Sequence, residues 1–397
     1  MKEKNQGVQS RIVSGSDHFL AGSICFIGFL LGIETGGLQF ILLKAANEFQ
    51  MSQTTMGSIV TVQFVAVTIA PLIVGTISDR IGKKKVIVSA CLLFACGSIV
   101  SILSSQMSIL LAGVVLIGFA FGSLETTITA ALSDAFGQRS GQYISLMQGC
   151  LSFGAVISPL AVNLAINQWG LNWRVLFWIC LIFAAVGGIS VFFANFHRTM
   201  PNSSNQIPGK LNFRDMFLIG AFLMIGLYMI VENNTTCFID TFFSTVLEDS
   251  RYSAAALSGF WAAMTISRFL FSALYEKRQV ILPVLCAIGG LLLIAMNWLE
   301  HPAVVLASLF VIGLCYGPMS PFIMNMAVER YPEKSGTTAG LMLGFMGAGG
   351  AVGPVLGGYI ADLFGLRLTY LSTGMLVLAE IVIFFVFMTQ SRKRRML

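Results

Sequence analysis

The stretch Gly75-Thr-Ile-Ser-Asp79-Arg80-Ile-Gly82-Lys83-Lys84 joins two apolar runs, residues 53–78 and 84–105. Each run is long enough to cross a bilayer, because a spanning helix needs about 20 mostly apolar residues. The charges gather in the short connection between the runs. This part of the chain therefore predicts two membrane-spanning helices joined by a tight loop.

The composition of the whole chain agrees with this local prediction. Of its 397 residues, 56% are hydrophobic and only 11% are charged, whereas about a quarter of the residues of a soluble domain are charged. The basic residues stand in short clusters between apolar runs, without the basic, aromatic-bearing patch that nucleic-acid binding requires. The eight cysteines lie inside apolar runs without metal-ligand spacing, so we expect no metal site, no cofactor and no nucleic-acid partner.

Twelve apolar segments have the length of a membrane span. They cover residues 18–44, 53–78, 84–105, 107–133, 142–168, 173–195, 214–245, 252–275, 279–299, 302–328, 336–363 and 367–389. The polar stretch 197–212 contains two prolines and predicts a flexible linker. The expected fold is all-α, with an N-terminal six-helix bundle over residues 1–196, the linker, and a C-terminal six-helix bundle over residues 213–397.

The basic residues predict the orientation of this bundle. Alternate connecting segments hold 19 of the 24 lysines and arginines, whereas the other connections hold three; Lys44 and Arg268 fall within spans. Basic loops stay on the cytoplasmic side. We therefore expect both termini and the linker to be cytoplasmic. The N-terminus lacks a cleavable signal sequence, so the first span should be retained.

The two halves of the sequence repeat each other. A shift of 195 residues brings Gly118, Gly149 and Pro159 onto Gly313, Gly344 and Pro354. Such a repeat predicts two related bundles about a pseudo-twofold axis, with a binding site between them near the midplane of the membrane.

The connection at residues 75–84 resembles the signature loop of the major facilitator superfamily, Gly-xxx-Asp-Arg/Lys-x-Gly-Arg/Lys-Arg/Lys. Gly75 would let two helices approach closely, Asp79 would cap a helix or pair with a cation, and Gly82 would form the turn. The resemblance implies that Gly75, Asp79, Arg80, Gly82 and Lys83 control the conformational cycle. The equivalent loop of the second half, at residues 273–278, is degenerate.

The eleventh span is rich in glycine over residues 347–358. The run is no dinucleotide-binding loop, since its spacing fails and no strand precedes it. Small residues let helices approach closely in lipid, and Pro354 can bend the helix. We expect this segment to serve in packing and in rocking of the halves.

Charged residues inside spans cost about 2.5–3.5 kcal/mol each on insertion scales, so each requires a reason. The acids are Glu34, Glu125, Glu232, Asp240 and Glu380. In the major facilitator architecture the first, fourth, seventh and tenth spans line the cavity. The candidate solute-binding residues on these spans are Glu34, Gln39, Glu125, Thr129, Tyr228, Glu232, Asn233, Tyr316 and Asn325.

Three roles follow for the charged residues. Glu34 and Glu125 are the candidates for proton coupling, because a carboxyl in apolar surroundings can load and release a proton as water access alternates. Arg268 requires a partner, for which Glu232 on the neighbouring span is the candidate. Glu380, on a peripheral span, is expected to make a structural hydrogen bond, and Asp240 to lie near the outer mouth.

A narrower resemblance concerns the solute. Gly118-Phe-Ala-Phe-Gly122-Ser-Leu-Glu125-Thr126 is similar to the fourth-helix motif of the fucose–galactose–glucose:proton symporter group. Leu227-Tyr228-Met-Ile-Val-Glu232 resembles its seventh-helix pattern, and Ser320-Pro321 and Arg268 are also similar. Thr129-Ala130 stand where that group has Asn-Pro. This departure leaves room for a different sugar or for a solute that is not a sugar.

The prediction is a secondary active transporter, a proton symporter for a sugar or a similar polar solute that works by alternating access. The alternative is proton-driven efflux of amphipathic compounds or organic ions, because phenylalanine and methionine are abundant. No nucleotide-binding loop is present to drive transport with ATP. No enzyme signature stands out, and the loops are too short for a signalling domain. The expected partners are the solute, protons and lipid, without an obligate protein partner.

Overall fold

The computed structural model describes residues 15–196, 215–272, 274–331 and 334–393, and this part of the chain is helical. Twelve of its helical segments are long and apolar enough to cross a membrane, as predicted. The N-terminal half contains α1 (Gly15–Phe49), α2 (Gln53–Ile81), α3 (Lys83–Ile102), α4 (Met107–Phe136), α5 (Ser140–Asn167) and α6 (Val175–Phe193).

The C-terminal half contains six further spans. Its long helices are α7 (Met216–Cys237), α9 (Ser253–Ser272), α10 (Arg278–Ala295), α11 (Pro302–Tyr316), α12 (Met319–Arg330), α13 (Ser335–Phe364) and α14 (Leu366–Lys393), with the short α8 (Ile239–Thr241) after α7. The predicted linker at 197–212 lies outside the described residues, so the division of the chain there stays a prediction.

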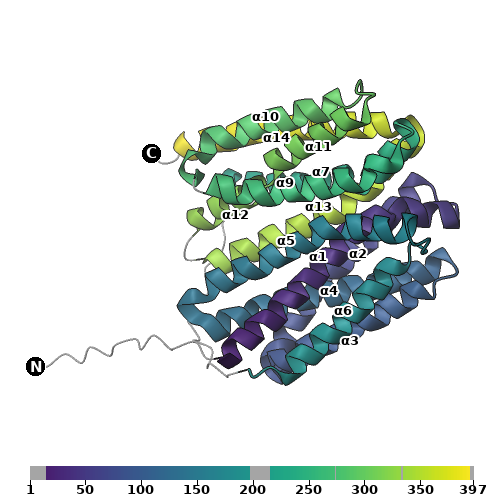
Figure 1. The fold of residues 1–397 in the computed structure, drawn as a ribbon. Coiled ribbons are helices and arrows are strands. Elements are labelled where there is room, and N and C mark those ends of the chain that lie inside the picture. The colour runs from purple at the N-terminus through teal and green to yellow at the C-terminus, as the bar shows by residue number, and fades with distance from the viewer. Residues whose placement is uncertain (1–14, 197–214, 273, 332–333, 394–397) are drawn as a thin grey trace, which may run out of the picture.

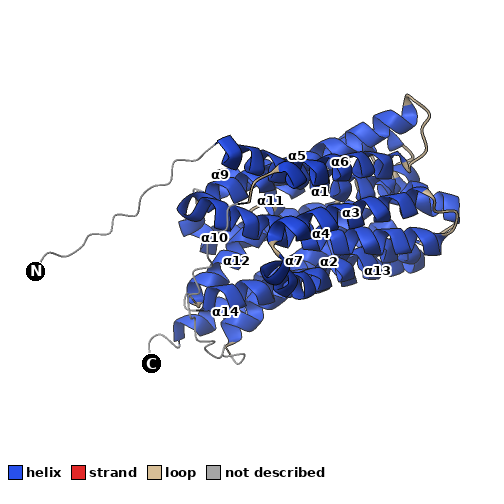
Figure 2. Ribbon diagram, turned by 90° about the horizontal axis from the view of Figure 1, so that it is seen from below, coloured by secondary structure: helices blue, strands red, loops and turns tan. Residues whose placement is uncertain are grey.

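The helices form two bundles that lie against each other (Figure 1). Helices α1–α6 pack on one another, as do α7–α14, and the halves meet mainly through α2 with α13 and through α5 with α9. Helix α1 begins and α14 ends at the same end of the molecule (Figures 1 and 2). The residues around the α2–α3 connection lie at this end, which we call the basic end. The other end, which holds the α1–α2 connection, is the opposite end.

The glycines of α13 pack on two different neighbours. A Cβ atom on Gly349 or Gly353 would collide with the backbone of α7, in the same half. A Cβ on Gly358 would collide with the backbone of α2, in the other half, and one on Gly350 with the ring of Phe64 in α2. The glycine-rich run therefore allows close approach on both faces, and the expected packing role is confirmed.

Two of the predicted spans are interrupted. The tenth span breaks at Gly317 and Pro318, between α11 and α12. The carbonyl of Gly317 would normally accept a hydrogen bond from residue 321, but Pro321 has no N–H to donate. The Arg268 Nε of α9 donates to this carbonyl instead, at 3.3 Å. The seventh span changes from α7 through α8 to a wider helical turn at Phe242–Val246.

Candidate functional site

The two halves are tied together toward the opposite end. Lys44 of α1 forms a salt bridge with Asp240 of α8, with 2.9 Å between Nζ and Oδ2. The ammonium of Lys44 also lies over the ring of Phe40, 3.9 Å from its centroid. The Asp240 side chain is only 4% exposed and that of Lys44 is 25% exposed. This pair gives the buried Asp240 a counter-charge, and it joins the first span to the seventh.

Helix α2 begins at the same end and is held by α13. The carboxylate of Asp362 accepts hydrogen bonds from the backbone N–H groups of Gln53 and Thr54, at 2.7 and 2.8 Å. It also accepts from the hydroxyl of Thr54 at 2.6 Å. Further along α2, the hydroxyl of Thr61 donates to the carbonyl of Ala351 at 2.5 Å. A carboxylate at a helix N-terminus is favoured by the helix dipole, so these contacts stabilise the joined arrangement.

The described ion pairs at the basic end each remain within one half. Lys83 pairs with Asp134 in the N-terminal half. In the C-terminal half, Asp215 accepts a hydrogen bond from Tyr331 and lies 3.6 Å from Arg330. Burial and the hydrogen bond to Asp215 raise the pKa of Tyr331 to about 12. These pairs stiffen each half without tying it to the other.

The signature loop at the basic end is partly as expected. Gly82 links α2 to α3 with a φ of 94°, a left-handed conformation that favours glycine, so its role in the turn is confirmed. The close approach expected at Gly75 is wrong for this conformation, since a Cβ there would meet nothing within 4 Å. Arg80 is exposed, and the side chain of Asp79 lies outside what the structure describes.

The two acids of the N-terminal half occupy different surroundings. Glu34 is 1% exposed, and its Oε1 accepts a hydrogen bond from the Gln63 amide of α2 at 2.7 Å. Its Oε2 has no hydrogen-bond partner. Glu125 of α4 is partly exposed and interacts with the side-chain amide of Gln148 in α5. The structure therefore keeps the two carboxyl groups with separate partners, and only Glu125 retains some exposure.

The C-terminal half brings a tyrosine, an acid and an arginine together. The hydroxyl of Tyr228 donates to Glu232 one turn further along α7. Arg268 attracts Glu232 electrostatically, but among the described residues no salt bridge joins the two. The charge pairing expected for these two residues is therefore electrostatic and without direct contact in this conformation, since the Arg268 Nε donates to the carbonyl of Gly317. Ser320 also interacts with the hydroxyl of Tyr228.

The remaining candidate residues differ in the hydrogen-bond partners of their polar groups. The hydroxyl of Thr129 and the amide of Asn233 donate to carbonyls of their own helices, at 2.7 and 3.0 Å. Gln39 accepts from the indole of Trp261 at 3.2 Å, which is another contact between the halves. Tyr316 is buried and stacks on Tyr228 with 6.0 Å between the ring centroids. Asn325 is exposed.

Sequence reasoning missed the partners of these residues. Gln63 and Gln148 stand in spans without a motif around them, and an amide alone gives no signal in an apolar helix. A signal did exist for Lys44 and Asp240, because two opposite charges inside spans each require compensation.

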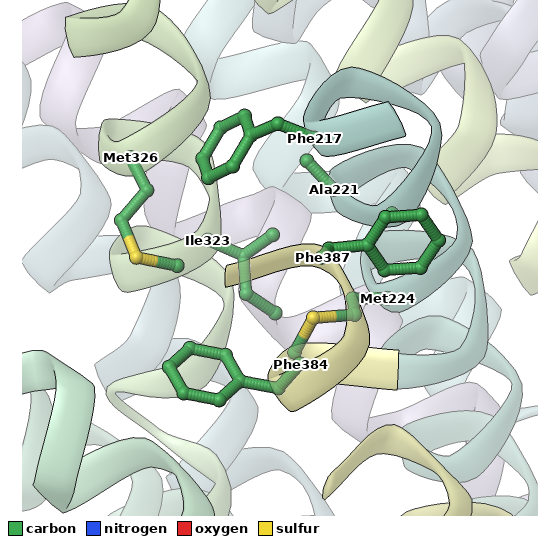
Figure 3. A pocket seen from close by; sticks show the side chains of 8 residues that line it. Phe217, Ala221, Met224, Ile323, Met326, Phe384 and Phe387 are labelled. Atoms are coloured by element: carbon green, nitrogen blue, oxygen red, sulfur yellow. The ribbon is translucent and has the colours of Figure 1, made fainter. Parts of the chain in front are cut away.

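Two apolar hollows lie away from these polar groups. One, of about 10 Å³, lies inside the C-terminal half and is shown in Figure 3; it is lined by Phe217, Gly220, Ala221, Met224, Ile323, Met326, Phe384 and Phe387. The other is a groove between α2 and α4, lined by Val62, Val65, Ala66, Ile69, Val115 and Phe119. Neither contains a polar side chain, so neither suits a polar solute.

The chain has twelve spans in two related halves. The halves are tied across one end, and several spans carry an acid near their middle. These features together define a polytopic membrane transporter. The sequence profile of the Major Facilitator Superfamily matches residues 24–348 and residues 301–396. The chain belongs to the major facilitator superfamily, as the signature loop indicates.

Curated relatives of this chain include several sugar transporters. The chain is 22% identical to the glucose/mannose transporter GlcP of Bacillus subtilis over 81% of its own length and 82% of that protein. It is 26% identical to the galactose-proton symporter of Escherichia coli over 48% of its length, which spans 41% of that symporter. The arabinose-proton symporter of the same species is matched at 26% identity, over 48% of this chain and 39% of that protein.

Solved structures share the fold at low identity. A bacterial homologue of the human lysosomal transporter Spinster, in an inward-facing and unoccupied conformation, superposes with a TM-score of 0.80. The two chains are 14% identical, and the match covers 94% of this chain and 97% of the other. This likeness concerns the fold alone.

Proposed function

We propose that this protein is a proton-coupled symporter for a sugar or a closely related polar solute, working by alternating access. The observation that carries the proposal is the placement of acids in both halves of a bundle tied across one end. Glu34, Glu125 and Glu232 all lie near the middle of their spans. The two proton symporters among the relatives support the coupling ion and the solute class.

The described contacts support one conformation of this cycle. The ties between the halves involve residues toward the opposite end, such as Lys44 with Asp240, while the described ion pairs of the basic end stay within one half. The basic end is cytoplasmic under the positive-inside rule. The solute path in this conformation then opens to the cytoplasm and is closed to the outside. Both termini are cytoplasmic in the same proposal.

Solute recognition in this proposal combines a carboxyl with an aromatic ring. The Tyr228–Glu232 pair presents a carboxylate that can accept sugar hydroxyl hydrogens and a ring that can cover an apolar sugar face. Glu125, with Gln148 beside it, supplies the facing acid of the N-terminal half. Thr129, Asn233 and Asn325 contribute at most secondary contacts, since the first two already hydrogen-bond their own helices.

Proton coupling is assigned to Glu125 and Glu34. A carboxyl that exchanges its proton must reach water in one conformation, and Glu125 is the partly exposed member of the two. Glu34 has one carboxylate oxygen without a partner and is closed off in this conformation. It therefore takes or gives its proton in the opposite conformation.

The test is transport into vesicles that hold the purified protein. A panel of sugars, polyols, organic acids and lipophilic cations is offered with and without an imposed pH gradient. We expect gradient-driven accumulation of a sugar, and Glu125→Gln should abolish accumulation while keeping solute exchange. Glu300→Gln, a change in an exposed loop, is the matched control. Export of lipophilic cations without sugar uptake would establish the efflux alternative.

A further inference from the structure

Glu380 of α14 is a buried acid of the C-terminal half that has almost no hydrogen-bond partners. Its side chain is 0% exposed, although α14 also carries exposed side chains such as Val382 and Phe385. Its Oε2 accepts only a weak hydrogen bond, from the thiol of Cys286 in α10 at 3.8 Å. Its Oε1 has no partner at all. The structural hydrogen bond expected for this residue is thus a single thiol contact.

Charge in this position would be strongly disfavoured. An ionised carboxylate removed from water requires a cation or several strong donors, and without them the group becomes neutral. Among the described residues, no salt bridge involves Glu380. Within the described ranges, the titratable groups that interact with Glu380 are Cys286 of α10 and Tyr316 of α11. Neither is a cation, so the surroundings favour a carboxylic acid that holds a proton.

Two buried tyrosine hydroxyls lie in the surroundings of Glu380 and of Glu232. The buried hydroxyl of Tyr316 lies in the electrostatic field of Glu380 and has no hydrogen-bond partner. The ring of Tyr316 stacks on that of Tyr228. The hydroxyl of Tyr228 already donates to Glu232, which also feels the positive charge of Arg268. Glu232 therefore has a hydroxyl donor and a cation beside it, whereas Glu380 has only a thiol.

We propose that Glu380 is a proton-binding site that exchanges its proton with Glu232 through the hydroxyls of Tyr316 and Tyr228. Tyr228 gives its proton to Glu232 and takes one from Tyr316, which takes one from Glu380. Each tyrosine accepts one proton and releases one, so the net change is one proton moved between the two acids. In this conformation no hydrogen bond joins the Tyr316 hydroxyl to a neighbour, so the path forms only when the Tyr316 side chain moves.

The inference adds a proton site to the proposed symport, but its test does not depend on transport. Infrared spectroscopy of the purified full-length protein detects the carbonyl stretch of a protonated carboxyl group, and transfer to D₂O shifts that band as the proton exchanges. We expect Glu380→Gln to remove one such band at neutral pH. We expect Tyr316→Phe, which keeps the ring, to leave the band and slow its shift at least roughly tenfold.

Tyr370→Phe is the matched control. It removes another buried tyrosine hydroxyl of the same half, one that donates to the Thr235 carbonyl at 3.0 Å. We expect exchange at Glu380 to keep its wild-type rate in this variant. The proposal is overturned if Glu380→Gln removes no band, if the band never shifts in D₂O, or if Tyr316→Phe exchanges as fast as the wild type. All of these measurements are made without a solute. Their outcome therefore does not depend on whether the symport proposal is correct.

Discussion

Removal of the Lys44 side chain should shift the protein away from the conformation described here. In Lys44→Ala the carboxylate of Asp240, 4% exposed, loses its only described salt bridge. Breaking a fully buried pair costs about 3–5 kcal/mol. Because Lys44 is 25% exposed and water can partly replace it, we expect a cost of about 2 kcal/mol. Asp240 becomes hydrated when the halves separate, so this cost falls on the closed arrangement of the opposite end.

A cost of 2 kcal/mol corresponds to roughly a 30-fold change in the equilibrium between the two conformations. Spin labels at Ser105→Cys and Glu300→Cys, two exposed positions near the opposite end, one in each half, can measure it in a background without the native cysteines. Pulsed electron resonance should show a longer distance gaining population in Lys44→Ala.

The double variant Lys44→Met with Asp240→Asn provides the control. It removes both charges, so no unpaired carboxylate is left, and its distance distribution should return most of the way to that of the parent. Two results would refute the reasoning: an unchanged distance distribution in Lys44→Ala, or a double variant shifted as far as the single one.

Three further predictions concern packing, gating and orientation. Gly349→Leu should lower the amount of folded protein, because α7 leaves no room for a side chain there. Gly75→Ala is the control and should fold normally, since the space around Gly75 is open. Equal losses of thermal stability in the two variants, measured by thermal unfolding, would contradict this. Asp79→Asn should slow turnover while the solute affinity stays within a few-fold, and a folded variant that no longer binds solute would exclude a purely gating role. Reporter fusions after Gln106 and Glu300 should report the outside, and a cytoplasmic signal at either would reverse the proposed orientation.

Much of the fold could be predicted because span length and loop charge are local properties of the sequence. The ends of the first span show the limit: residues 18–44 were expected, whereas α1 continues to Phe49. Polar residues such as Glu48 end an apolar run without ending a helix. Here Glu48 forms a salt bridge with Arg174, with 2.7 Å between Oε1 and Nη2.

The candidate site was harder to predict than the fold. Acids inside spans could be recognised one by one, but their partners depend on which helix faces which. Arg268 shows the difficulty. Glu232 on the neighbouring span was its expected partner and does attract it. The hydrogen bond of its Nε, however, goes to the carbonyl of Gly317, which Pro321 leaves without its usual donor. A carbonyl freed by a proline four residues later is visible in a sequence, and it can serve as a signal for where a buried arginine will lie.

The first turn of α2 is completed by a residue that belongs to the other half of the molecule. Ser52 satisfies the N–H of Thr55 from within the same half, whereas the N–H groups of Gln53 and Thr54 rely on Asp362 of α13. When the halves part, those two amides must turn to water, and so must the carboxylate. The end of this helix thus acts as a docking point whose hydrogen bonds exist only while the two halves are joined at the opposite end. Any condition that changes how well water solvates free amides and carboxylates will therefore act on the joining of the halves at this helix end.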